Sequence, residues 1–144
     1  MHISVKSLLI FTALLAVIIT TACSTSQSSK YELAPAGDLP SDIQDAPRVV
    51  TKAYQFAVAN PDVLTQLPCY CGCGEMGHTS NYACYVSGVD NNGSTVFDNH
   101  ALGCSICVDI TTDAMRMLDD GKSITEIRTY VDQTYSAFGP SNMP

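Results

Sequence analysis

The sequence contains no tryptophan, and it has few basic residues: 7 Lys and Arg stand against 14 Asp and Glu, giving a formal net charge of −7. Proteins that hold nucleic acid through its phosphates carry a basic surface, so nucleic-acid binding is not expected. The length of 144 residues leaves room for one domain of ordinary size. With 46% hydrophobic and 15% charged residues, the composition is that of a globular chain and not of a disordered one.

The sequence also lacks a hydrophobic run long enough to span a membrane. The longest run, residues 8–19, has 12 residues and is broken only by Thr12. At about 1.5 Å per residue it would extend roughly 18 Å as a helix, against a bilayer core of about 30 Å. It follows a short start that carries Lys6 and no acid, and small residues follow it. This pattern predicts a signal peptide over residues 1–22 and therefore export.

The end of this segment, Thr20-Thr21-Ala22-Cys23, resembles the lipobox of bacterial lipoproteins. The resemblance implies cleavage before Cys23, a diacylglycerol thioether on its sulfur, and acylation of the new N-terminus, with chains such as palmitate. Two or three acyl chains anchor a protein durably, whereas one chain is marginal. We therefore expect a lipid-anchored protein at the extracytoplasmic face of a bacterial cell membrane. The alternative is an ordinary secretory signal in which Cys23 is incidental.

Composition divides the rest of the chain into three parts. Residues 23–47 are rich in Ser, Pro and Asp and show no sustained hydrophobic period, which predicts a lipid-anchored flexible linker. Residues 48–138 are predicted to form a Cys/His-rich helical domain, and residues 139–144 a C-terminal tail.

The predicted fold is mainly α: a small helical domain with a C-terminal helical hairpin and a short inserted β-hairpin. Apolar residues recur at helical spacing from about residue 48 to 59 and from 124 to 135. Between them a helix is predicted that Asp98 or Asn99 can cap and that runs to about residue 120. The last two helices are joined at Gly121, and Ser123 with Glu126 forms a capping box, so they should lie antiparallel. Asn92-Gly93 lies between two strand-like segments and predicts the β-hairpin.

The cysteines and histidines gather in one part of the sequence. Apart from Cys23 and His2, all of them lie between residues 69 and 107: Cys69, Cys71, Cys73, His78, Cys84, His100, Cys104 and Cys107. His100, Cys104 and Cys107 are spaced i, i+4, i+7, which places them on one face of a single helix. The glycine-rich segment 69–79 has no period, and Gly72 would let the chain turn so that its sulfurs converge.

Thiolates held close together repel one another unless a cation lies among them. Thiolate and imidazole are the ligands that Zn(II) and Cu(I) prefer. The sequence therefore predicts that these eight residues bind a soft metal, copper(I) or zinc(II). Eight ligands exceed one tetrahedral shell, so either two ions share the site or a four-ligand site is accompanied by spare thiols or one disulfide. The predicted role is capture, buffering or delivery of the ion, with a metal-donor or metal-acceptor protein as partner. A binding protein is favoured over an enzyme because no isolated base is evident.

Two other uses of the cysteines remain open. Export favours disulfide bonds, and six cysteines can form three of them, which would make a stapled structural lipoprotein. Cys104 and Cys107 are spaced as in a thiol–disulfide oxidoreductase. Covalent haem is excluded, because Val108 and not histidine follows Cys107.

The arrangement of these residues is similar to the bacterial PCYCGC-motif lipoproteins. The similarity covers about residues 49–136 and rests on the segment Pro68-Cys69-Tyr70-Cys71-Gly72-Cys73, with Gly77-His78, Cys84, His100-Ala101 and Cys104-Ser-Ile-Cys107 after it. It implies export, lipid anchoring and grouping of the cysteines as one unit, and it implies no particular activity. A fainter similarity relates the last two helices to membrane-tethered thiol proteins of cytochrome c maturation, in which only Cys104 and Cys107 would correspond.

Overall fold

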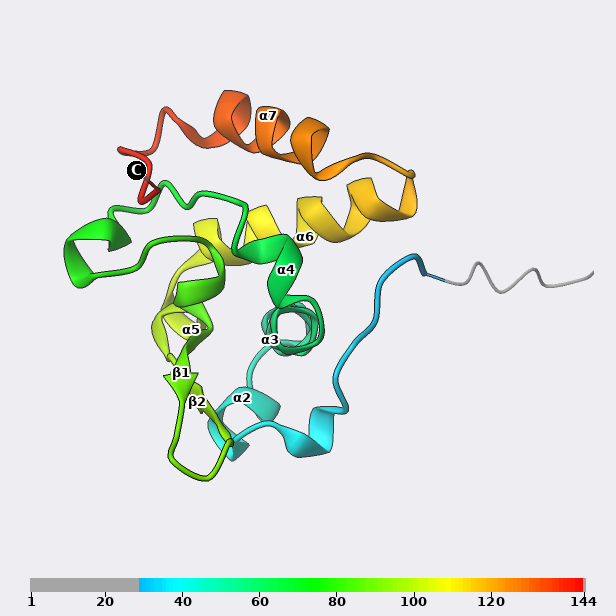
Figure 1. Cartoon of the computed structure of the whole chain (residues 1–144), viewed down its shortest axis with the longest axis vertical. Coiled ribbons are helices and arrows are strands. Elements are labelled where there is room, and N and C mark those ends of the chain that lie inside the picture. Colours follow the sequence, from blue (N-terminus) through cyan, green and yellow to red (C-terminus); the bar gives the residue numbers. More distant parts are fainter. Residues whose placement is uncertain (1–28, 144) are drawn as a thin grey trace, which may run out of the picture.

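A computed structural model describes residues 29–143 (Figure 1). The predicted signal peptide and the predicted lipidation residue Cys23 lie outside the described residues. In chain order the elements are the 3-10 helix η1 (Ala36–Asp38), α2 (Ser41–Gln44), α3 (Arg48–Ala59), α4 (Pro61–Leu64), the 3-10 helices η2 (Cys73–Met76) and η3 (Tyr82–Cys84), β1 (Val86–Val89), β2 (Thr95–Phe97), α5 (His100–Gly103), α6 (Ser105–Asp119) and α7 (Ile124–Tyr135). Among these residues no helix combines the length and the hydropathy that crossing a bilayer requires.

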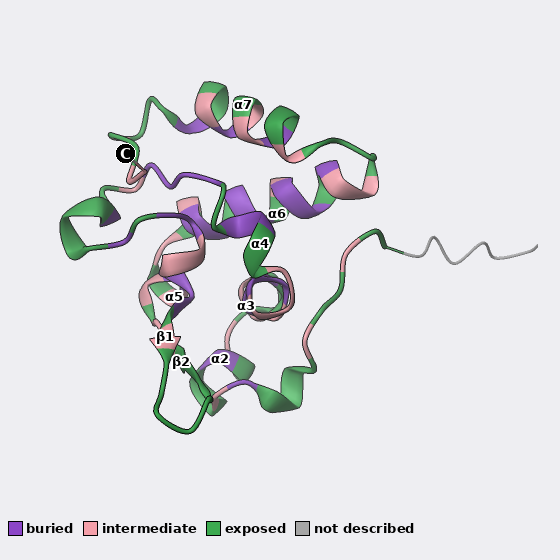
Figure 2. Cartoon of the chain, in the orientation of Figure 1, coloured by how far each residue is buried: buried purple, intermediate pink, exposed green. Residues whose placement is uncertain are grey.

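The predicted mainly helical fold with an inserted hairpin is confirmed. Helix α6 crosses α3, and α7 lies along the other side of α6 (Figure 1). Each of the three helices buries one apolar stripe toward its neighbours, as Figure 2 shows. Tyr54 and Phe56 of α3, Ile110 of α6 and Val131 of α7 are fully buried. The core is therefore built where the three helices meet, as their 3.6-residue periodicity predicts.

The helix cap, the helix end and the hairpin predicted from local sequence signals are also confirmed. Ser123 Oγ accepts a hydrogen bond from the backbone N–H of Glu126, whose carboxylate accepts from the backbone N–H of Ser123, so the capping box starts α7. Gly121 has a φ of 79°, a left-handed conformation that ends α6 and that glycine adopts without strain. Strands β1 and β2 pair antiparallel, and Asp90 Oδ1 stabilises their connection by accepting from the backbone N–H groups of Asn92 and Ser94.

The flexible linker predicted over residues 23–47 is wrong for the part that the structure describes. Leu39 and Ile43 are buried in the core. The backbone N–H of Ala34 donates to the carbonyl of Gln55 on α3 (3.0 Å). Apolar side chains in a Pro-rich segment need no helical period to be buried, which is why periodicity missed this packing. The folded unit therefore begins well before residue 48.

The predicted C-terminal tail, residues 139–144, also lies against the folded unit as far as residue 143. The backbone N–H of Asn142 donates to the carbonyl of Cys69 (3.0 Å). A Cβ at Gly139 would stand 2.8 Å from the carbonyl oxygen of Tyr70, so only glycine permits the tail to pass this close. The tail thus fastens the start of the PCYCGC segment.

The single helix predicted from a cap at Asp98 or Asn99 to about residue 120 is a second wrong prediction. The chain forms α5, then an extended Cys104 with φ −122° and ψ 101°, then α6. Gly103 directly precedes the break, and glycine weakens a helix interior by about 1 kcal/mol relative to alanine. Cys104 is therefore the N-cap residue of α6, and Cys107 lies in its first turn.

Candidate metal centre

The PCYCGC segment curls as its glycines permit. Gly72 and Gly77 have φ values of 84° and 92°, and η2 lies between them. The curl brings the Sγ atoms of Cys69, Cys71 and Cys73 within 4.8 Å of one another. The predicted convergence of these three sulfurs is present in the structure.

Asn142 holds this segment in place. Its side-chain Oδ1 accepts a hydrogen bond from the backbone N–H of Cys69 (2.6 Å). Its Nδ2 donates to the carbonyl of Ser80 (3.0 Å) and contacts Cys73 Sγ at 3.5 Å. The tail therefore links both ends of the curl to the loop that follows.

Helices α5 and α6 supply the cluster residues that face the PCYCGC segment. The carbonyl of Cys107 accepts hydrogen bonds from the Tyr85 hydroxyl (2.8 Å) and from Asn81 Nδ2 (3.3 Å). Tyr85 and Asn81 are fully buried, and Thr111 Oγ1 donates to Asn81 Oδ1 (2.8 Å). This buried polar network fixes the first turn of α6 beneath the sulfurs.

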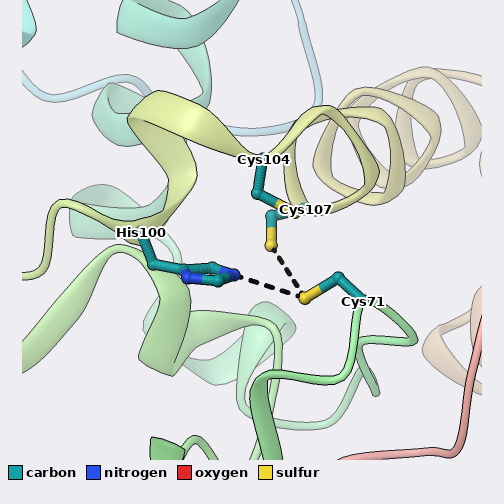
Figure 3. A group of neighbouring side chains, drawn as sticks. All are labelled: Cys71, His100, Cys104 and Cys107. Atoms are coloured by element: carbon teal, nitrogen blue, oxygen red, sulfur yellow. Dashed lines mark hydrogen bonds between the residues drawn. The ribbon is translucent and has the colours of Figure 1, made fainter.

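Four of the predicted ligands form what we call the outer group: Cys71, His100, Cys104 and Cys107. Their ligand atoms all lie within 4.8 Å of one another (Figure 3). Cys71 Sγ is 3.3 Å from His100 Nε2 and 3.7 Å from Cys107 Sγ. A Zn–S bond of about 2.3 Å in a tetrahedron implies sulfurs about 3.8 Å apart. The outer group therefore has the size of a tetrahedral zinc site.

Three further predicted ligands form what we call the inner group: Cys73, His78 and Cys84. Their ligand atoms lie within 4.8 Å of one another and of a nitrogen of His100. Cys73 Sγ and Cys84 Sγ are 3.7 Å apart, again the edge of a tetrahedral site. The rings of His78 and His100 meet edge to face with centroids 5.1 Å apart, so the two groups adjoin.

His78 has one ring nitrogen with a partner and one without. Nε2 lies 3.4 Å from Asp98 Oδ2. Nδ1 is buried and has no hydrogen-bond partner among the described residues. A proton on Nε2 that is shared with the carboxylate leaves a lone pair on Nδ1, the form of histidine that binds metal. Asp98 is itself held, because Tyr54 donates to its carbonyl (2.7 Å) and its Oδ1 accepts from the backbone N–H of His100 (2.8 Å).

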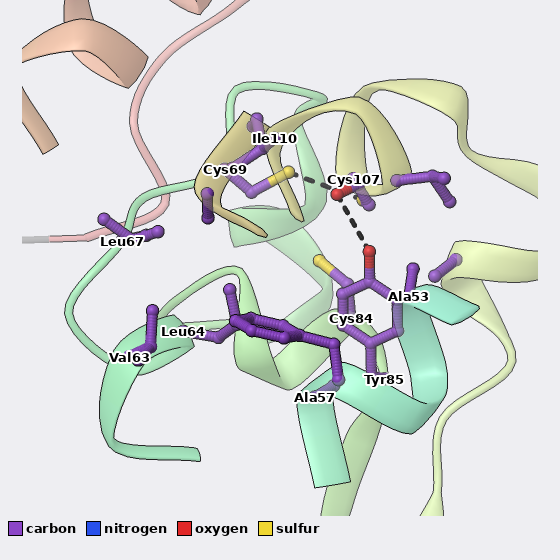
Figure 4. Packing of buried hydrophobic residues seen from close by; sticks show 14 of the residues in the cluster. Ala53, Ala57, Val63, Leu64, Leu67, Cys69, Cys84, Tyr85, Cys107 and Ile110 are labelled. Carbon is purple, nitrogen blue, oxygen red and sulfur yellow. Dashed lines mark hydrogen bonds between the residues drawn. The ribbon is translucent and has the colours of Figure 1, made fainter. Parts of the chain in front are cut away.

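Cys69 lies between the two groups. Its Sγ is 3.4 Å from those of Cys71 and Cys107 and within 4.8 Å of those of Cys73 and Cys84. Figure 4 shows Cys69, Cys84 and Cys107 among the apolar side chains of the core. Hydrogen bonds from the thiols of Cys107 and Cys84 lower the pKa of Cys69, whereas burial raises the pKa of Cys71 and Cys73.

The structure thus brings together all eight residues predicted as ligands, and the six cysteines are free thiols. Cysteine and histidine groups positioned in this way can hold a metal ion, and the geometry does not identify the metal. Sequence reasoning missed Asp98, which it treated as a helix cap, and Asn142, which it placed in the tail. The closeness of Asp98 to His100 in the sequence could have indicated that Asp98 lies at the site. No sequence signal indicated this for Asn142.

Comparison with protein families agrees with the motif. A family model described as a protein of unknown function with PCYCGC motif matches residues 12–143. The chain belongs to this family. The PCYCGC match extends beyond the 49–136 region of the sequence resemblance and includes the N-terminal segment and the tail that the structure places on the domain. Searches of the curated proteins and of the solved structures found no match.

Proposed function

We propose that this protein is a membrane-anchored lipoprotein that binds a soft metal ion, copper(I) or zinc(II), through its Cys/His cluster outside the cytoplasm. The ion is captured, buffered or delivered there. Lipid attachment at Cys23 is supported by the signal-like start of the sequence and by the lipobox resemblance. A metal-donor or metal-acceptor protein is the expected partner.

The partnerless Nδ1 of His78 is the observation that carries metal binding. A buried polar atom without a partner costs about 1–3 kcal/mol, so folded proteins rarely leave one. One ring nitrogen of His78 lies within 4.8 Å of the sulfurs of Cys73 and Cys84. A metal ion among these atoms would satisfy Nδ1 and would cancel the repulsion between thiolates in a buried place.

Elemental analysis of the full chain tests this proposal. The chain is purified anaerobically in mild detergent, and metal and protein are quantified together. We expect a stoichiometric amount of zinc or copper, and free thiols that become reactive only after chelation and denaturation. A protein with no bound metal after anaerobic incubation with Zn(II) or Cu(I) would disprove the proposal.

One observation favours a second candidate, a thiol–disulfide oxidoreductase. Cys104 is partly exposed at the N-cap of α6, and Cys107 follows in the first turn with its Sγ within 4.8 Å. The free N–H groups of a helix N-terminus stabilise a thiolate. This candidate predicts a reversible two-electron couple that Cys104→Ser abolishes, together with no stoichiometric metal; the metal proposal predicts the reverse.

A further inference from the structure

We propose that the cluster holds two metal ions of unequal accessibility. A resident ion lies in the inner group with Cys69, and an exchangeable ion in the outer group is the one passed to a thiol-bearing acceptor. This inference rests on the proposed function and adds the number of ions, their ligands and the route of transfer.

The number of candidate ligands suits two ions. Tetrahedral zinc takes four ligands, and the cluster offers eight. The outer group supplies four of them. Cys73, His78 and Cys84 supply three more, and Cys69 Sγ, within 4.8 Å of Cys73 and Cys84, completes the second set. Each residue is then used once, and Cys69 also lies 3.4 Å from Cys71 and Cys107, where it can bridge the two ions.

The negative charge of six thiolates also favours two ions over one. The members of the cluster are six cysteines and two histidines, and no salt bridge or side-chain hydrogen bond among the described residues brings a lysine or arginine to them. One divalent ion would leave four thiolate charges uncompensated at a largely buried place, where uncompensated charge is costly. A second ion halves that excess.

Burial makes the two positions unequal. Cys73, His78 and Cys84 are buried, and Cys69 is fully buried. In the outer group only Cys107 is buried, while Cys71, His100 and Cys104 are partly exposed. An incoming ligand must reach the ion before a resident ligand leaves it. The outer ion is therefore the one that an acceptor can approach, on the side of Cys71 and Cys104.

The transfer step needs no oxidant or reductant. An acceptor thiol loses a proton as its sulfur binds the ion. The bond between the ion and Cys104 then breaks, and the released thiolate takes up a proton. Repetition at Cys71, Cys107 and His100 moves the ion without change of its oxidation state, and the inner ion keeps the fold of the cluster during the exchange.

Release kinetics of the zinc-loaded full chain test the inference. The chain is loaded with Zn(II) anaerobically in detergent and mixed with excess EDTA, and zinc release is followed over time. We expect two ions per chain and two phases of equal amplitude, one fast and one slow. Fewer than two zinc ions per chain, or two ions released in one phase, overturns this inference while leaving the proposed function intact; a chain that binds neither Zn(II) nor Cu(I) overturns both.

Variants assign the phases. Cys104→Ser should abolish the fast phase and remove one ion per chain, because its side chain belongs to the outer group alone. Ser105→Ala, at the exposed neighbouring position, should keep both phases. His78→Gln should abolish the slow phase, and circular dichroism shows whether each variant is folded. Loss of the slow phase in Cys104→Ser, or loss of both ions in that folded variant, contradicts the assignment.

Discussion

Cys69 lies at the centre of the cluster, where its sulfur is close to those of four other cysteines. Its Sγ lies 3.4 Å from two sulfurs, and its backbone N–H and carbonyl are both held by Asn142. The backbone of Cys69 is thus held by one residue 73 positions away in the sequence. Because Cys69 Sγ lies near members of both groups, holding the backbone of Cys69 helps to set the positions of the outer and inner groups relative to each other.

We predict that Asp98 acts through His78 as a positioning residue. Its carboxylate lies 3.4 Å from Nε2 and holds the tautomer that leaves Nδ1 free for metal. In Asp98→Asn the amide can still accept from the backbone N–H of His100, but an amide N–H facing Nε2 favours the opposite tautomer. We predict that metal affinity at the inner group falls about 10–100-fold, the usual effect of losing such a partner.

Competition with a chromophoric zinc chelator measures this affinity. Asp109→Asn, an exposed carboxylate on α6, is the matched control and should bind as the unaltered chain does. If Asp98→Asn binds zinc as tightly as Asp109→Asn, the carboxylate does not orient the ligand.

At the scale of elements, local rules predicted those parts of the fold that local chemistry decides. The capping box at Ser123, the ending of α6 at Gly121 and the Asn92-Gly93 hairpin depend on residues within a few positions, and all are present. The break at Cys104 was missed because the spacing of His100, Cys104 and Cys107 suits one continuous helix. Gly103 was the single local sign against it.

Contacts between residues far apart in the sequence could not be predicted. The packing of Leu39 and Ile43 has no periodic pattern, and Asn142 reaches Cys69 from near the end of the chain. The eight candidate ligands could be chosen because cysteine and histidine are rare in this sequence and are concentrated in one part of it. Their division into two groups could not, because it depends on which sulfurs the curl at Gly72 and the break at Cys104 bring together.

The capping box of α7 makes a pH-dependent contribution to stability. Hydrogen bonds from the backbone and side chain of Ser123, and then from Lys122, lower the pKa of Glu126 to about 2. Because the folded pKa lies below the unfolded value of about 4.3, this contribution is complete above pH 4.3 and is lost as the pH falls toward 2. Glu126→Gln keeps an acceptor for Ser123 but removes the charge.

We therefore predict that the difference in unfolding free energy between the unaltered chain and Glu126→Gln is largest near neutral pH and shrinks below pH 4.3. Urea unfolding at a series of pH values, in the presence of EDTA, measures it. Glu32→Gln, at an exposed glutamate outside the helix, should show no such pH-dependent difference. A difference that is constant from pH 7 to pH 2 would refute the role given to the carboxylate.

At the scale of the whole molecule, the cluster joins segments that have little regular secondary structure of their own. The PCYCGC curl and the loops before β1 contain 3-10 turns and no long helix, yet they carry most of the ligands. The apolar core lies mainly among α3, α6 and α7. We therefore predict that metal binding stabilises the half of the molecule that holds the cluster, in the manner of small domains with a structural metal.

Metal removal should accordingly lower the melting temperature of the whole chain. Free metal at about 1,000 times its dissociation constant stabilises the folded state by about 4 kcal/mol. For a domain of this size 1 kcal/mol corresponds to a few degrees, so we predict a fall of about 10 °C or more on chelation under reducing conditions. Calorimetry of the full chain with and without EDTA measures the shift.

Zn(II) added in excess of the chelator should restore the melting temperature and Mg²⁺ should not, because thiolate and imidazole ligands do not suit magnesium. Equal melting temperatures with and without the bound ion would mean that the sulfurs are held in place by the protein alone.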